Sequence, residues 1–179
     1  AAIYFWRQLP NSEQLPVSFV VARKEAALVS QRIVDLTGAT NEKIRAVNFS
    51  DFSGDPDKAL AFINDARETN KDAHKQAIVL ASNLQKLAAS LAEIRSSEKQ
   101  RLAYEAVAVE LGLVSEFIVY TESLNGFLDN LARAIATDLS SDREMVDRSL
   151  REVNEKVGKI NSLNKQFTMN MAVFDGSVR

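Results

Sequence analysis

The only histidine of the chain, His74, has the side chain best suited to acid–base or metal chemistry. A di-iron helical bundle would need two Glu-x-x-His motifs on facing helices, but position 71 is a lysine and there is no second histidine. A Ser–His–Asp triad would have to use His74 from the middle of a predicted helix. We therefore expect His74 to be a solvated or partly packed side chain.

Acidic side chains also occur at intervals along residues 98–138, where paired carboxylates could act as acid and base: Glu105, Glu110, Glu116, Glu122 and Asp129. Their spacing spreads them round the polar face of a helix, so we expect them to be solvated. Glycines occur singly, which argues against a phosphate-binding loop, and the absence of cysteine excludes disulfides, thiolate zinc sites and thiol catalysis. The sequence therefore predicts no enzyme, no metal site and no cofactor.

Polar residues interrupt the apolar stripes of the predicted helices at four positions: Asn70, Thr121, Asn125 and Asn164. An asparagine in a coiled-coil core fixes the register and the number of partner helices at some cost in stability. The alternative is a polar pocket for a small ligand, with Tyr104 and Tyr120 in its walls. These four residues are the candidate register or pocket site.

The strongest structural pattern follows Asp55, which is suited to cap a helix, and Pro56, which fits its first turn. From there apolar or small residues recur at alternating intervals of four and three: Ala59, Ile63, Ala66, Asn70, Ala73, Ala77, Leu80, Leu84, Leu87, Leu91 and Ile94. A sustained repeat of this kind is typical of coiled-coil packing. It predicts a helix from residue 56 to about 94.

A turn is predicted at residues 95–98, because Ser97 and Gln100 form a capping box that starts a new helix. The alternative is one unbroken helix of about 80 residues, ~120 Å long. The helix predicted over 98–138 carries two adjacent apolar stripes, so it is either the central helix of a bundle or the face of an oligomer. Close approach of another helix would explain Gly112 and Gly126 within it.

The remaining segments predict a first and a last helix. Apolar residues recur over 18–36 and again over 40–47, and Gly38 either breaks or kinks the helix there, with a connection from Phe49 to Gly54. A second capping box, Ser141 with Glu144, starts a helix that ends near residue 175. Its predicted stripe is Val146, Leu150, Val153, Val157, Ile160, Asn164, Phe167 and Met171. We therefore predict an all-α, elongated, antiparallel up-down four-helix bundle with long coiled-coil-like helices, one domain over 17–175 and a tail at 176–179.

Residues 1–16 are predicted to form an arm outside the bundle. Tyr4, Phe5, Trp6 and Arg7 resemble the interfacial end of a transmembrane helix, although so few residues cannot span a bilayer, which needs about 20. The segment is either the remnant of a membrane anchor or an apolar arm that packs on the bundle or on a neighbouring chain.

The net charge of −2 is evenly spread, and without a dense basic face we expect no nucleic-acid binding. An anchor-like start followed by a long bundle favours a non-enzymatic, membrane-anchored, extracytoplasmic scaffold or protein–protein interaction module. Its contact would lie on the first helix or on residues 98–138, with a protein partner or a second copy. The alternative is the ligand-sensing bundle of a membrane receptor, which would bind a small ligand.

Overall fold

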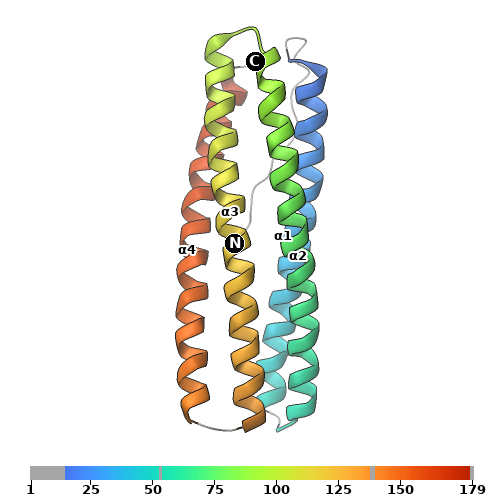
Figure 1. Ribbon diagram of the computed structural model, residues 1–179, viewed down its shortest axis with the longest axis vertical. Helices are drawn as coiled ribbons and strands as arrows, with labels where there is room; N and C mark the ends of the chain where they lie inside the picture. The colour runs from blue at the N-terminus through green and yellow to red at the C-terminus, as the bar shows by residue number, and fades with distance from the viewer. Residues whose placement is uncertain (1–14, 53, 138–139, 178–179) are drawn as a thin grey trace.

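The chain folds as four long antiparallel helices that lie side by side (Figure 1). The computed structural model describes residues 15–52, 54–137 and 140–177. Its elements are α1 (Val17–Phe52), α2 (Pro56–Ser90), the short 3-10 turn η1 (Leu91–Glu93), α3 (Ser97–Thr137) and α4 (Ser140–Ser177). The predicted all-α four-helix bundle is confirmed, and the turn before α3 excludes the single unbroken helix.

Helix α2 is the best-predicted element. Asp55 caps it as expected, since its carboxylate accepts the backbone N–H of Lys58 at 3.1 Å. All eleven predicted stripe positions from Ala59 to Ile94 are buried. The stripe is buried along its whole length because α2 packs against α1 on one side and α3 on the other.

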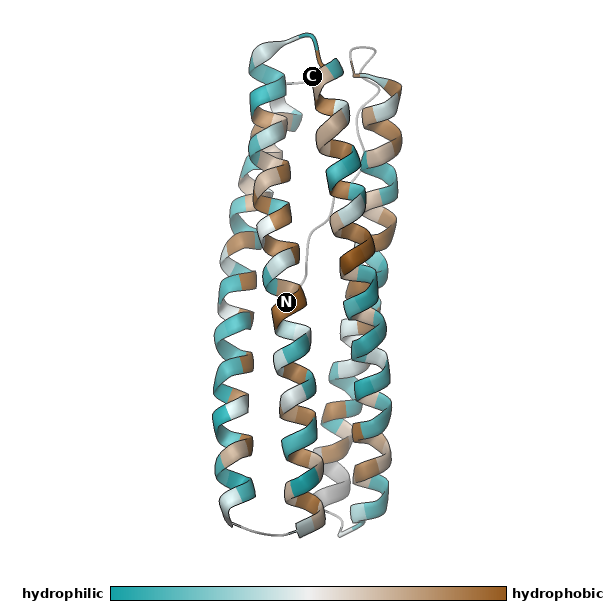
Figure 2. Cartoon of the chain, in the orientation of Figure 1, coloured by the Kyte–Doolittle hydropathy of each residue, from teal (hydrophilic) through white to brown (hydrophobic). Residues whose placement is uncertain are grey.

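Helix α3 has two apolar stripes because it packs against both α2 and α4. Residues of both stripes are buried, including Phe117 and Leu124 of one and Val114 and Leu128 of the other. The contacts with two neighbouring helices of the same chain account for the width of this apolar surface. The hydropathy of the ribbon shows the same arrangement, with apolar stretches of α2 and α3 alternating with polar outer positions (Figure 2).

Helix α1 corrects one expectation about the first third of the chain, because it includes Phe49 and Phe52, which the sequence analysis assigns to a connection. The connection to α2 is therefore much shorter than predicted. Gly54 has a φ of 73° there, a left-handed conformation that favours glycine. Helix α1 also continues through Gly38, so of the two alternatives for this glycine a break is excluded.

Neither predicted capping serine stands before its helix, because Ser97 is the first residue of α3 and Ser141 is the second residue of α4. The cap of α3 is Ser96 and not Ser97, because Ser96 Oγ accepts the backbone N–H of Lys99 at 3.4 Å. The side chain of Gln100 instead donates to the carbonyl of Leu91 at 3.0 Å and so closes the turn. At the other end of the bundle α4 begins at Ser140, one residue before the predicted cap.

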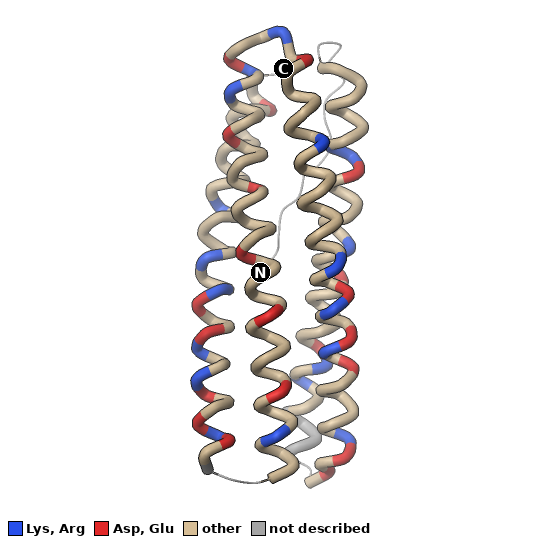
Figure 3. Tube along the Cα trace, in the orientation of Figure 1, with Lys and Arg blue, Asp and Glu red and all other residues tan. Residues whose placement is uncertain are grey.

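The stripe of α4 also differs from the prediction at one position. Leu150 is exposed, whereas Val153, Ile160, Phe167 and Met171 are buried as expected. The reason is that α4 packs mainly against α3, while α1 approaches it less closely, so the buried side of α4 is narrow. Basic and acidic residues are interspersed along all four helices (Figure 3).

The expectation that Gly112 and Gly126 allow close helix contact is wrong. A Cβ added to Gly112 would meet only Leu163 Cδ2 at 4.0 Å, an ordinary contact, and one added to Gly126 would meet nothing within 4 Å. Gly126 is also exposed. It therefore lowers the stability of α3 without a packing benefit.

Replacing Gly126 with alanine should stabilise the protein by about 0.5–1 kcal/mol, because alanine restricts the unfolded chain and favours the helix. Urea unfolding followed by circular dichroism at 222 nm measures the change. Destabilisation would mean that the glycine is needed for a contact or a bend at this position.

Candidate functional site

Three of the four polar candidates form one cluster where α2 faces α3. Asn70, which is buried, donates through Nδ2 to the backbone carbonyl of Thr121 at 2.7 Å and to Asn125 Oδ1 at 2.9 Å. Both protons of the Asn70 amide are thereby used. The contact fixes the position of α2 along α3, as a polar residue in a coiled-coil seam does.

His74 extends the same cluster by one helical turn. Its Nδ1 lies 2.8 Å from Thr121 Oγ1, and the Thr121 hydroxyl donates its proton to the Ile118 carbonyl at 2.7 Å. With its proton on the Ile118 carbonyl, the hydroxyl can accept from Nδ1–H of the ring, so His74 and Thr121 are joined across the α2–α3 contact. His74 is half-buried and its role in this geometry is to tie α2 to α3.

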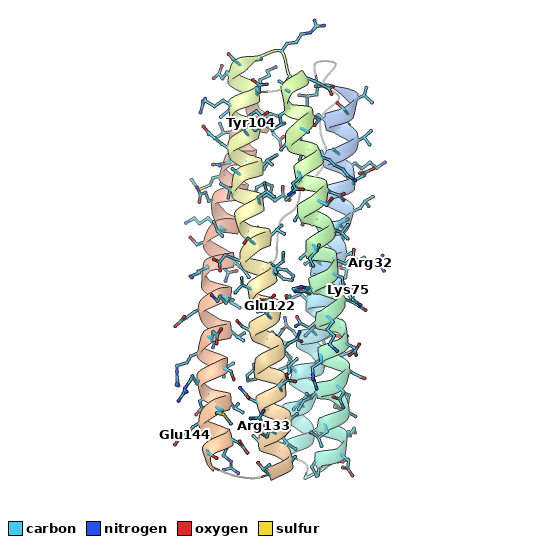
Figure 4. All side chains as sticks on the ribbon, in the orientation of Figure 1. Arg32, Lys75, Tyr104, Glu122, Arg133 and Glu144 are labelled. Atoms are coloured by element: carbon cyan, nitrogen blue, oxygen red, sulfur yellow. The ribbon has the colours of Figure 1, made fainter. Side chains whose placement is uncertain are left out.

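The other predicted residues lie apart from this cluster. Asn164 is on α4 beside Leu163, which faces Gly112, and Gly112 lies more than two turns of α3 from Thr121. Tyr104 is exposed on the outer side of α3 (Figure 4). The candidates thus do not form a single pocket. Tyr4, Phe5, Trp6 and Arg7 lie outside the described residues.

A buried charged group near the start of α1 was missed by sequence reasoning. Arg23, with 4% of its side chain exposed, pairs with Asp175 of α4 at 3.2 Å. Burial lowers the pKa of the Arg23 guanidinium, and the charges of Asp175 and Glu110 oppose that shift. Glu110 is fully buried, so its assignment to a solvated face was wrong.

The physical reason for this burial is the geometry of the helix ends. The first turns of α1 and the last turns of α4 meet, with the rings of Phe19 and Phe174 5.9 Å apart. Arg23 follows Phe19 by one helical turn and therefore lies on the same side of α1. There the carboxylates of Asp175 and Glu110 compensate its charge. In the sequence, this burial is indicated only by the position of Arg23, a basic residue one helical turn after the stripe residue Phe19.

A cavity of about 290 Å³ lies between α1, α3 and α4, midway along the bundle. We call it the Gly38 cavity, and its lining consists of Val34, Thr37, Gly38, Asn41, Phe117, Tyr120, Val157, Ile160 and Asn161. Burial raises the pKa of the Tyr120 hydroxyl, so this phenol is neutral at physiological pH. Tyr120 is the one residue of this lining that the sequence had suggested.

The described residues offer no evident metal site and no membrane-spanning helix. In residues 15–52, 54–137 and 140–177 no three histidine or acidic side chains are grouped to hold a metal ion. None of the helices described here is long and apolar enough to cross a membrane. Comparison of the chain with protein-family models, with curated proteins and with solved structures found no match.

The contact between Asn70 and Asn125 predicts a coupled loss of stability. Asn70→Ala should cost about 1–3 kcal/mol, because it removes two hydrogen bonds from a buried site. A double-mutant cycle with Asn125→Ala should give a coupling of about 1 kcal/mol, measured by urea unfolding. Strictly additive effects would contradict a stabilising hydrogen bond between the two amides.

Proposed function

We propose that this chain is a non-catalytic helical-bundle module, tethered to a membrane and extracytoplasmic, that binds another protein through the outer face of the α1–α2 hairpin. The observation that supports it most is a set of exposed aliphatic side chains. Leu28 of α1 is 65% exposed, and Val79 of α2 is 44% exposed. Clustered aliphatic residues at a surface are typical of interaction sites.

We define the hairpin face as Val21, Leu28 and Arg32 of α1 with Lys75 and Val79 of α2. Val21 and Leu28 are seven residues apart and so share the outer side of α1. Charged residues of both helices meet on this side, because the pKa of the Asp72 carboxyl is affected by a residue of α2 and by a residue of α1. Lys75, by its hydrogen bond and charge, and then Arg32, by its charge, lower the pKa of Asp72. Arg32 and Lys75 lie at the same outer edge (Figure 4).

The charges around the hairpin face indicate the kind of partner. In the stretches that carry this face, residues 21–32 of α1 and 72–86 of α2, the exposed bases Lys24, Arg32, Lys75 and Lys86 outnumber the acids Glu25 and Asp72, and Asp72 pairs with Lys75 at 2.8 Å. A second copy would bring like charges together. The face instead suits an amphipathic helix whose apolar residues are flanked by acidic ones.

Photo-cross-linking from Leu28 tests this proposal in the cells that produce the full-length protein. We expect a photoreactive phenylalanine at position 28 to give a discrete adduct with a different protein, through an acidic amphipathic helix. The matched control is the same group at Met169, a comparably exposed position on α4. With the identified partner, Leu28→Ala and Arg32→Glu should each weaken binding about tenfold, the effect of a central interface residue.

Three outcomes would overturn the protein-binding proposal. Equal adducts at positions 28 and 169 would show no preferred face. Adducts only with a second copy would show self-association. Adducts only with lipid would show a membrane-binding surface.

The membrane tether in this proposal depends on the aromatic residues near the start of the chain. Tyr4, Phe5 and Trp6 followed by Arg7 have the composition of an interfacial anchor, where amphipathic rings lie at headgroup level. Trp6 is the only tryptophan of the chain, so its fluorescence reports on this segment alone.

Vesicles that contain brominated acyl chains should quench Trp6 emission by about half if the ring lies at the membrane interface. The control carries Trp6→Phe together with Tyr104→Trp, which moves the single tryptophan to an exposed site on α3. Its emission should be unaffected by the vesicles. Unquenched Trp6, or equal quenching of both proteins, would argue against the tether.

A further inference from the structure

We infer that the Gly38 cavity is a binding site for a small, neutral aromatic molecule that carries one amide-like hydrogen-bonding group. The site is distinct from the hairpin face, because it opens between the two hairpins and not on the outside of one. α1 packs mainly on α2, and α4 mainly on α3, so the space between α1 and α4 is only partly filled. The cavity lies in that space.

The walls of the cavity favour an aromatic ligand. Phe117 and Tyr120 have their rings 5.6 Å apart and inclined at 39° to each other, and both are buried. The aliphatic side chains of Val34, Val157 and Ile160 complete the apolar part of the lining. A ring placed in the cavity would displace water and contact these side chains over the small part of their surface that is still exposed.

The polar groups of the lining favour a neutral ligand with a donor and an acceptor. Asn41 and Asn161, on α1 and α4, each offer an amide that donates and accepts. Thr37 donates its hydroxyl proton to the Ile33 carbonyl at 2.8 Å, so towards the cavity it can only accept. No lysine, arginine, aspartate or glutamate lines the cavity, and a charged ligand would therefore lose hydration without compensation.

The size of the cavity limits the ligand to one ring. A volume of about 290 Å³ is at the lower end of ligand pockets, which hold roughly 300–1,000 Å³. Gly38 is an exposed residue of the cavity lining, and a Cβ built on it would meet nothing within 4 Å. A larger side chain at position 38 therefore has room to extend over the mouth of the cavity without displacing backbone.

Benzamide and benzoate form a matched pair for the test, since they share a ring and differ in charge. Titrated into the full chain, benzamide should bind with a dissociation constant of about a millimolar, as expected for so small a ligand. Benzoate should bind at least ~10-fold more weakly. Methyl NMR should place the benzamide-induced shifts at Val34, Val157 and Ile160.

Two glycine variants separate occupancy of the cavity from effects on folding. Gly38→Leu should abolish benzamide binding while raising the melting temperature by ~2–4 °C, because leucine favours a helix over glycine. Gly126→Leu is the control, since Gly126 is also an open glycine in a helix but lies outside the cavity lining. It should gain stability similarly and retain benzamide binding.

The inference is wrong if benzamide binds Gly38→Leu as well as the unaltered protein, or if benzoate binds as tightly as benzamide. It is also wrong if no benzamide binding occurs. If, in that case, Gly38→Leu shifts the fluorescence of Trp6, the cavity belongs to a segment of this chain and not to a small molecule. None of these outcomes affects the hairpin-face proposal, which uses different residues.

Discussion

The two hydrogen bonds that Asn70 donates across the α2–α3 contact determine how the halves of this bundle fit together. α1 pairs with α2 and α3 pairs with α4, so α2 and α3 form the principal joint between the two hairpins. Apolar side chains alone define such a joint poorly, since the repeat permits shifts of a whole heptad. The Asn70 amide reaches the Thr121 carbonyl and Asn125 in one register only. In a shifted register these buried polar groups would be unpaired, which costs free energy.

The pairing of the helices into two hairpins determines where α1 and α4 are in contact and where a cavity separates them. Near the chain ends of the bundle, the Arg23–Asp175 pair and the Phe19–Phe174 contact hold α1 against α4. Midway along the rod the Gly38 cavity lies between these helices. Closure at the end and an opening at the centre thus arise from one arrangement of two hairpins.

The sequence was most informative where one helix alone determines the outcome. The stripe of α2 was predicted without error because it is buried by neighbours on both sides, so periodicity and burial coincide. The predicted burial of Leu150 was wrong for the opposite reason, since it depends on how closely another helix, α1, approaches α4. Glu110 and the Gly38 cavity are likewise tertiary features: a buried carboxylate looks solvated until Arg23 of another helix is placed near it.

The order of the helices in space, which follows their order in the chain, has a consequence for the folding kinetics. Each major contact joins helices that are consecutive in sequence, and the connections between them are short. Closing such loops costs little chain entropy, and topologies rich in local contacts fold fastest. Each hairpin has its own sequence-local interface, so the α2–α3 joint is expected to form after the hairpins. The rate-limiting step would then be the alignment of two preformed helical pairs.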